Sequence, residues 1–388
     1  MKPGTPGFVG ARLREAREAR GLTALALADA LGISRAAISQ YESDHQTPHP
    51  RVMERISSVV NLPTAFFMRP VLEPDHGMIF YRSLRSAAKQ SRTRLARRIG
   101  WLQHLVAFIH QYVEFPKVNF PQFNLPKDPA RLSNEDIEHL AGELRNFWHL
   151  GDGPLGSIVT LVENNGATVS RDDFLMDEVD ALAKWDASAD RPFLLLNDNK
   201  HSGARSRMDI CHEIAHIILH RHLCPEDLSA ALHALIEEQA NRFAGAFALP
   251  ARRFAAELEL GSLSLDFFQQ LKAKNKMSIG SMIVRAGQLG FLNGEQAQRL
   301  WMRRTRNGWH VREPLDDELP VEAPHFLPKA MLLMLESKVV TRQTVLSACP
   351  FAPNDIEMLT GLSSGSLTEP EVQPKILSFA PRLTKKPE

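Results

Sequence analysis

The feature that most constrains the fold of this 388-residue chain is a pair of histidines four positions apart in an otherwise apolar segment. His212 and His216 fall on one face of an α-helix, separated by a rise of ~6 Å, so both imidazoles can reach one Zn²⁺ at ~2.0–2.1 Å. The surrounding side chains are aliphatic: Ile210, Ile214, Ile217, Ile218 and Leu219. We therefore predict a buried helix over residues 205–220 that presents a metal site.

Glu213 follows His212 directly and projects about 100° further round the helix. This brings its carboxylate close to the open coordination position of a zinc ion, where it can take a proton from a bound water. The pattern predicts a zinc hydrolase in which His212 and His216 are ligands and Glu213 is the catalytic base.

A zinc site of this class needs a third protein ligand, which we place on the next predicted helix, residues 227–249. The apolar stripe of that helix is Leu232, Ile236, Ala240, Phe243 and Phe247. Glu237 borders this stripe and shares a face with Asn241, which could hold a liganding histidine by a hydrogen bond. Glu238 aligns with Arg242 at i+4, the spacing of a solvent-exposed ion pair. We favour Glu237 as the third ligand, with His233 and Glu238 as alternatives.

Two stretches, PFLLLNDNKHSGARSRMDICHEIAHIILH and EEQANRFAGAFALP, resemble the ImmA/IrrE family of zinc metallopeptidases. Residues 145–166, Gly308-Trp309 and Glu313-Pro314 extend the resemblance over residues 75–315. In that family the helix with this second pattern supplies a glutamate ligand, which implies Glu237 here. The resemblance implies a zincin-like, gluzincin-type endopeptidase that uses Zn²⁺. Ala215 stands where many relatives have glycine, and we do not expect its methyl group to inactivate the site.

The first 70 residues are typical of short helices joined by tight turns, and Ser34 is placed to cap a helix over residues 35–42. Ile38 and Tyr41 share the inward face of that helix. Its exposed end and outward face carry the residues that we expect to meet DNA: Ser34, Arg35, Ala36, Ser39 and Gln40.

Residues 8–68, which include LADALGISRAAISQYE, resemble the Xre family of phage-repressor helix-turn-helix domains. The resemblance implies a double-stranded DNA operator and, because such readers recognise paired half-sites, a homodimer. Two positions depart from the family pattern: Ala24 replaces a common glutamine, and Ser43-Asp44 replaces a common glycine. The alternative is a five-helix module that only mediates dimerisation or protein contact.

Residues 78–113 contain basic but no acidic side chains. Apolar residues recur there at three-, four- and seven-residue steps from Leu84 to Ile109, which predicts one long amphipathic helix. The basic residues are Arg82, Arg85, Lys89, Arg92, Arg94, Arg97 and Arg98. They either form a solvated face, meet an acidic partner within the chain, or contact phosphate.

Short β-type runs at residues 167–170 and 193–196 interrupt a sequence that is otherwise helical in pattern. We therefore expect a mainly α fold with a small β-sheet (α+β). The expected parts are a helix-turn-helix domain at 1–70, a basic helical linker at 71–130, a zincin-like metallopeptidase domain at 131–315, and a C-terminal region of unknown role at 316–388.

The amino-acid composition bears on the cellular location of the protein and does not identify its chemistry. Lys and Arg total 46 against 45 Asp and Glu, so basicity of the whole protein is no clue to a nucleic-acid partner. Three cysteines cannot form a disulfide framework, and we expect Cys211 to be a core thiol. Neither a secretory start nor a membrane-length apolar run is evident, so we expect a cytoplasmic protein without a membrane partner.

Two functions fit these observations. In the first, a DNA-binding transcriptional regulator carries a zinc endopeptidase that cleaves a regulatory protein, a repressor or antitoxin-like partner. In the second, a non-proteolytic repressor or antitoxin-like protein uses the peptidase fold to sense a ligand or to hold a partner. We expect His220 and His222 to be surface or loop histidines, and the pattern leaves Arg205 and Arg207 open between substrate contact and helix capping.

Overall fold

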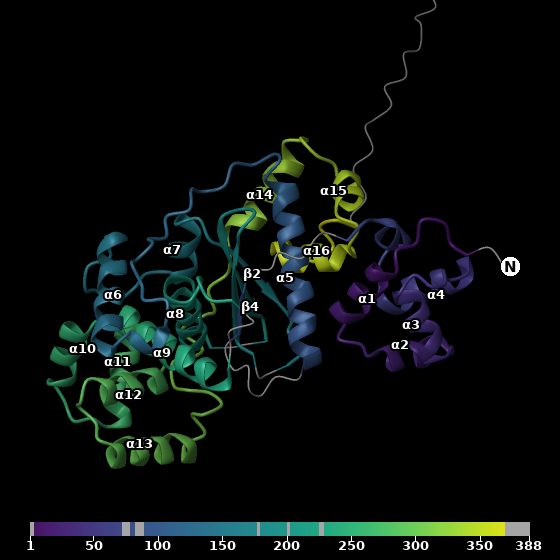
Figure 1. Cartoon of the computed structure of the whole chain (residues 1–388). Helices are drawn as coiled ribbons and strands as arrows, with labels where there is room; N and C mark the ends of the chain where they lie inside the picture. Colours follow the sequence, from purple (N-terminus) through teal and green to yellow (C-terminus); the bar gives the residue numbers. More distant parts are fainter. Residues whose placement is uncertain are drawn as a thin grey trace, which may run out of the picture.

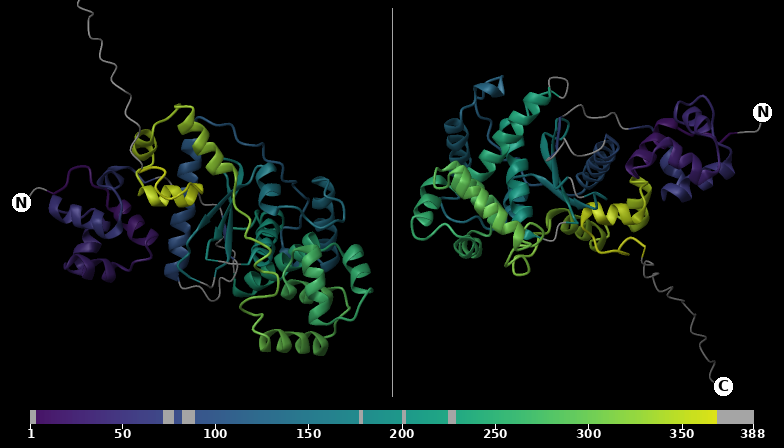
Figure 2. Two further views of the ribbon diagram at one scale, coloured as in Figure 1. Left: turned by 180° about the vertical axis from the view of Figure 1, so that it is seen from behind. Right: turned by 90° about the horizontal axis from the view of Figure 1, so that it is seen from below.

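A computed structural model describes residues 4–71, 78–81, 89–176, 179–199, 202–224 and 229–368 of the chain. An N-terminal helical lobe lies at one end of the molecule, a small sheet lies at the centre, and the helices of residues 251–306 lie at the other end (Figures 1 and 2). The predicted class, mainly helical with one small sheet, is confirmed.

The N-terminal lobe consists of α1 (Gly10–Ala19), α2 (Ala24–Leu31), α3 (Arg35–Glu42), α4 (Pro50–Val60) and the 3-10 helix η1 (Thr64–Met68). Thr23 and Ser34 begin α2 and α3, because each hydroxyl accepts a hydrogen bond from the backbone N–H three residues further on. Gly32 ends α2 in the left-handed conformation, with φ 61°. The cap at Ser34 is the one predicted from the sequence.

The central sheet contains β1 (Ile79–Tyr81), β2 (Thr168–Asp172), β3 (Ala181–Asp186) and β4 (Arg191–Asn197), in the order β1-β3-β4-β2. β3 is antiparallel to both β1 and β4, whereas β2 runs parallel to β4. Because side chains alternate along a strand, the sheet borders two hydrophobic cores. Leu182, Phe193 and Leu195 belong to one core, and Ala183, Leu194 and Leu196 belong to the other.

The prediction of one helix over residues 78–113 is wrong at its start. Residues 79–81 pair with β3 as strand β1, and α5 (Lys89–Ile109) begins after them. A three-residue strand is too short to show its own periodicity, so the strong helical pattern that follows concealed it. Arg82, Leu84 and Arg85 lie outside the described residues.

Three of the basic side chains of α5 meet partners within the chain. Arg97 pairs with Glu18 of α1 at 2.9 Å, and Arg94 donates to the carbonyls of Asp173 and Phe174. Arg98 is buried between two aspartates. The structure therefore favours intramolecular partners over phosphate for these three arginines.

On one face of the sheet, α7 (Ile158–Asn164) and α8 (Gly203–Leu219) pack against the strands. α9 (Ala230–Ala248) packs on α8, while α6 (Asn134–Phe147) and the 3-10 helix η2 (Pro129–Arg131) pack on α9. The helices beyond them are α10 (Ala251–Leu258), α11 (Leu265–Asn275), α12 (Ile279–Gln288) and α13 (Gly294–Arg306).

After α13 the chain crosses the start of α8 and returns to the opposite face of the sheet. A Cβ at Gly203, the first residue of α8, would lie 2.4 Å from the carbonyl oxygens of Leu319 and Pro320, so only glycine permits this crossing. The chain then forms α14 (Phe326–Glu336), α15 (Arg342–Ala348) and α16 (Pro353–Thr360). α14 and α16 contact β2, and Figure 2 shows α16 beside the N-terminal lobe. Residues 369–388 lie outside the described residues.

Candidate functional site

Helices α8 and α9 bring three of the predicted site residues together. The Nε2 atoms of His212 and His216 lie 3.0 Å apart. The carboxylate of Glu237 reaches both, with Oε1 at 3.1 Å from His216 Nε2 and Oε2 at 3.4 Å from His212 Nε2. Among the described residues, these three form a group, the convergent group, whose ligand atoms all lie within 4.8 Å of one another. His233 and Glu238 do not belong to it.

The buried stripe of α9 determines which of its acidic residues faces α8. Ile236, Ala240 and Phe243 are buried, which turns Glu237 toward the histidines and leaves Glu238 exposed. The predicted pair between Glu238 and Arg242 is wrong, because Arg242 binds Glu138 of α6 at 3.1 Å instead. Glu138 also binds Arg285 of α12, so a neighbouring helix outcompetes the i+4 partner.

The residues predicted to contact DNA form one exposed surface of the N-terminal lobe, the reading face. Ser34, Arg35, Ala36, Ser39 and Gln40 are all exposed, whereas Ile38 is fully buried and Tyr41 is half-buried. Asp44, one of the residues that replace the family glycine, adopts the left-handed conformation with φ 57°. Its carboxylate accepts a hydrogen bond from the backbone N–H of Gly10 at 2.6 Å, which ties the turn after α3 to α1.

Comparison with protein families gives two matches. Residues 13–67 match the helix-turn-helix family, and residues 162–286 match a peptidase family described as the IrrE N-terminal-like domain. The chain fuses a DNA-binding helix-turn-helix domain to an IrrE-like peptidase domain. A comparison with curated proteins finds no match. The peptidase match is shorter than the resemblance over residues 75–315, but it includes α8, α9 and all three members of the convergent group.

The convergent group of the peptidase domain is buried and charged. His212, Glu213 and His216 have no exposed surface, while 19% of the Glu237 side chain is exposed. Burial alone would raise the pKa of Glu237, but hydrogen bonds and charge from His212 and His216 outweigh it and hold that pKa well below its ordinary value. Two imidazole nitrogens and an ionised carboxylate are the donor set of a gluzincin zinc site, so these residues fit the metal that the family implies.

The Nδ1 atom of each histidine, on the far side of the ring from Glu237, has a hydrogen-bond partner. His212 Nδ1 lies 3.1 Å from Asn241 Oδ1, and His216 Nδ1 lies 3.0 Å from His220 Nδ1. Phe80 of β1 stacks on the ring of His216, with 4.7 Å between ring centroids and 10° between planes. These contacts fix the planes of two side chains that would otherwise rotate about χ2.

Three further residues of the site were not predicted from the sequence: His220, Phe80 and Gln239, which binds His220. The prediction of His220 as a surface or loop residue is wrong, because it is fully buried at the end of α8, whereas His222 is exposed. The available signal was the spacing of His220, four residues after His216 and therefore on the same helix face. Phe80 could not be found because its strand was interpreted as helix.

Other polar residues of α8 act in the framework. Arg205 donates to the carbonyls of Trp309 and His310, and Arg207 donates to those of Leu155 and Gly156. Because each arginine binds main-chain carbonyls of another segment and holds that segment against α8, a structural role is favoured over contact with a substrate. Burial raises the pKa of Cys211 to about 12, which agrees with the predicted core thiol.

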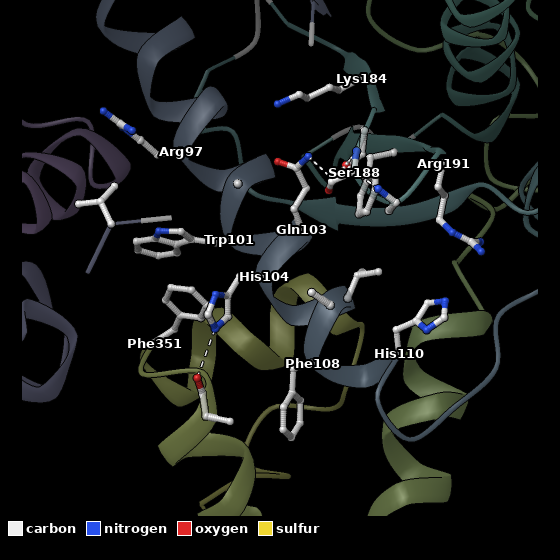
Figure 3. A pocket seen from close by; sticks show the side chains of 18 of the residues that line it. Arg97, Trp101, Gln103, His104, Phe108, His110, Lys184, Ser188, Arg191 and Phe351 are labelled. Atoms are coloured by element: carbon white, nitrogen blue, oxygen red, sulfur yellow. Dashed lines mark hydrogen bonds between the residues drawn. The ribbon is translucent and has the colours of Figure 1, made fainter. Parts of the chain in front are cut away.

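A groove of about 1130 Å³ lies on the opposite face of the sheet, between α5, β3 and the C-terminal helices (Figure 3). Trp101 and Phe351 stack at 4.8 Å along it, and Gln103 donates to Asp186 at 2.7 Å. None of its lining residues belongs to the convergent group, so this hollow is separate from the site on α8 and α9.

Within the described residues, no helix combines the length and apolarity needed to cross a membrane.

Proposed function

We propose that this DNA-binding regulator is a zinc endopeptidase that cleaves a regulatory protein, a repressor or antitoxin-like partner. The observation that carries the proposal is the convergence of His212, His216 and Glu237 within 4.8 Å, with Glu213 on the same helix as both histidines. The predicted DNA contacts Ser34, Arg35, Ala36, Ser39 and Gln40 are exposed together on the helix-turn-helix domain of the same chain.

In this proposal the three convergent residues hold Zn²⁺. A zinc ion held there would supply Lewis acidity toward a peptide carbonyl and toward water. Glu213 accepts the proton of the attacking water and then passes it to the leaving amine. Asn241 and His220 keep the two imidazoles in place through these steps. Glu213 has no exposed surface, so its carboxylate is shielded from bulk water.

The substrate class follows from the fusion. A helix-turn-helix domain concentrates the peptidase at operators, where proteins bound to the same or adjacent DNA are the accessible substrates. Paired half-sites favour a homodimer, and a cytoplasmic location is part of the proposal. A weaker alternative is that the helix-turn-helix domain only delivers the peptidase to a DNA-bound repressor, which leaves the chemistry unchanged.

A second function is favoured by the burial of the site. His212, Glu213 and His216 are all inaccessible to solvent, which suits a non-proteolytic regulator that uses the peptidase fold to sense a ligand or to hold a partner. The two functions differ in whether Glu213 breaks a bond, and one substitution separates them.

The decisive experiment compares cells that express the wild type, Glu213→Gln and Glu238→Gln, by quantitative proteomics and by the zinc content of the purified proteins. Glu213→Gln should keep zinc because its carboxylate is not a ligand, and a protein fragment present in wild-type cells should disappear. Glu238→Gln, an exposed change on α9, should match the wild type in both measurements. Identical proteomes in the wild type and Glu213→Gln, with zinc bound in both, would establish the non-proteolytic function. A wild type that binds no zinc would refute the proposed metallopeptidase.

A further inference from the structure

Behind His216, a line of hydrogen bonds runs from the metal-facing side of α8 to the main chain of η2. His216 Nδ1 lies 3.0 Å from His220 Nδ1, and His220 Nε2 lies 3.0 Å from Gln239 Oε1. Gln239 Nε2 then donates to the carbonyl oxygen of Pro129 at 2.7 Å. His216 and His220 have no exposed surface and Gln239 is 3% exposed, so water cannot replace these partners.

The Pro129 carbonyl gives this line a direction. A carbonyl oxygen can only accept, so the end of the Gln239 amide that faces Pro129 must be the NH₂ group, and the amide oxygen must face His220. An amide oxygen also only accepts, so His220 Nε2 carries a proton. In neutral His220 the other ring nitrogen, Nδ1, is then bare and accepts the proton of His216 Nδ1.

The opposite direction is physically unfavourable. It would turn the amide oxygen of Gln239 toward the carbonyl oxygen of Pro129, placing two acceptors 2.7 Å apart in a buried position without a proton between them. Buried polar groups left without partners cost about 1–3 kcal/mol each, so a single direction dominates.

We infer that Pro129, acting through Gln239 and His220, sets the tautomer of His216 so that its Nε2 lone pair faces His212 and Glu237. His220 and Gln239 are thus positioning residues for the zinc site, and the inference rests on the proposed function of that site. Phe80 supports them by stacking on the His216 ring. His212 is held differently, because its partner Asn241 is exposed to solvent.

The test measures the ring protonation of His220 and the zinc affinity of the full chain. Protein labelled with ¹⁵N in its histidine rings is examined by long-range ¹⁵N–¹H correlation spectra, both metal-free and loaded with zinc, and His220 is assigned by the signals lost in His220→Gln. Zinc affinity is measured by competition with a chelator. The variant is Gln239→Met, which keeps the side-chain length. Asn275→Leu is the matched control, because Asn275 is a buried amide on α11 that binds Glu257 and lies outside the site.

In the wild type, His220 should show a protonated Nε2 and a bare Nδ1 with and without zinc. Gln239→Met should mix the two tautomers of His220 and so disturb its hydrogen bond to the liganding His216. Zinc binding should weaken by up to about 10–100-fold, the usual effect of losing a hydrogen bond to a liganding histidine. Asn275→Leu should lose thermal stability but keep the tautomer and the affinity.

A wild-type His220 protonated on Nδ1 would overturn the inference, and this result needs only His220→Gln, for the assignment, and not Gln239→Met. It would also be overturned if Gln239→Met behaved like Asn275→Leu in both measurements. Because the tautomer is measured in metal-free protein, a wild type that bound no zinc would refute the proposed function alone.

Discussion

The guanidinium of Arg98 and the carboxylate of Asp172 form a buried two-point ion pair that joins α5 to the end of β2. Arg98 Nε donates to Asp172 Oδ2 at 2.6 Å, and Nη2 donates to Oδ1 at 2.8 Å. Arg98 also binds Asp355 of α16, and Asp355 in turn binds Arg20 at the end of α1. Four charges therefore connect the helix-turn-helix domain, α5, α16 and the sheet.

Arg98→Met should destabilise the protein by about 3–5 kcal/mol, because it leaves the buried carboxylate of Asp172 without its cation. The control is Arg97→Met, one position earlier on α5. Arg97 pairs with Glu18, but its side chain is 33% exposed, so its loss should cost about 0–1 kcal/mol. Urea denaturation followed by far-ultraviolet circular dichroism measures both. Equal effects of the two variants would show that the Arg98 network does not join the domains.

The attachment of the helix-turn-helix domain should weaken in acid. Burial alone would raise the pKa of Asp355, but hydrogen bonds and charges from Arg20 and Arg98 outweigh it and lower that pKa below its ordinary value of 3.8. Stabilisation by this carboxylate is therefore complete above about pH 4 and is lost as the pH falls through the lowered value.

The measurement compares urea midpoints of the wild type and Asp355→Asn from pH 7 to pH 3. The difference between them should stay constant down to about pH 5 and shrink below pH 4, as the wild-type carboxylate becomes protonated. A difference that grew in acid would mean that Asp355 is stabilised in its protonated form, contrary to the ion pairs seen here.

Arg35→Ala should weaken binding to the specific operator by about 1–3 kcal/mol and leave zinc content unchanged. The reading face and the convergent group border different hydrophobic cores, on opposite faces of the sheet. The control is Arg299→Ala, an exposed arginine on α13 at the far end of the molecule (Figure 1). Titration of operator and random DNA separates the roles: equal loss on both would make Arg35 a phosphate contact, and no loss on either would remove it from the interface.

Local signals in the sequence predicted much of the fold and of the site's geometry. The caps at Thr23 and Ser34 and the stripe through Ile236 and Phe243 depend on neighbours within one helix, so periodicity and spacing reveal them. β3 was not predicted, because Lys184 and Asp186 make a buried strand look polar. Arg98 and Asp355 are 257 positions apart, and no local pattern indicates such a pair.

The identity of the third zinc ligand can be tested by three substitutions on α9. Glu237→Gln should sharply reduce zinc occupancy, because a neutral amide replaces the anionic oxygen that lies 3.1 Å from His216 Nε2. Glu238→Gln should leave zinc bound and stability unchanged within ~0.5 kcal/mol, since Glu238 is exposed and Arg242 binds Glu138. Asn241→Ala should fall between them, with affinity lower by about 10–100-fold through the loss of its contact with His212.

This order depends on the orientation of α9, which the burial of Ile236, Ala240 and Phe243 determines. Zinc content after dialysis, measured by mass spectrometry on equal amounts of folded protein, gives the ranking directly. If Glu238→Gln lost zinc while Glu237→Gln kept it, α9 would have to be rotated by about 100°, which would expose its buried stripe. Zinc retained by all three variants would instead place the third ligand outside α9. We expect Glu237→Gln to lose the most, because Glu237 supplies the only carboxylate in the convergent group of the described residues.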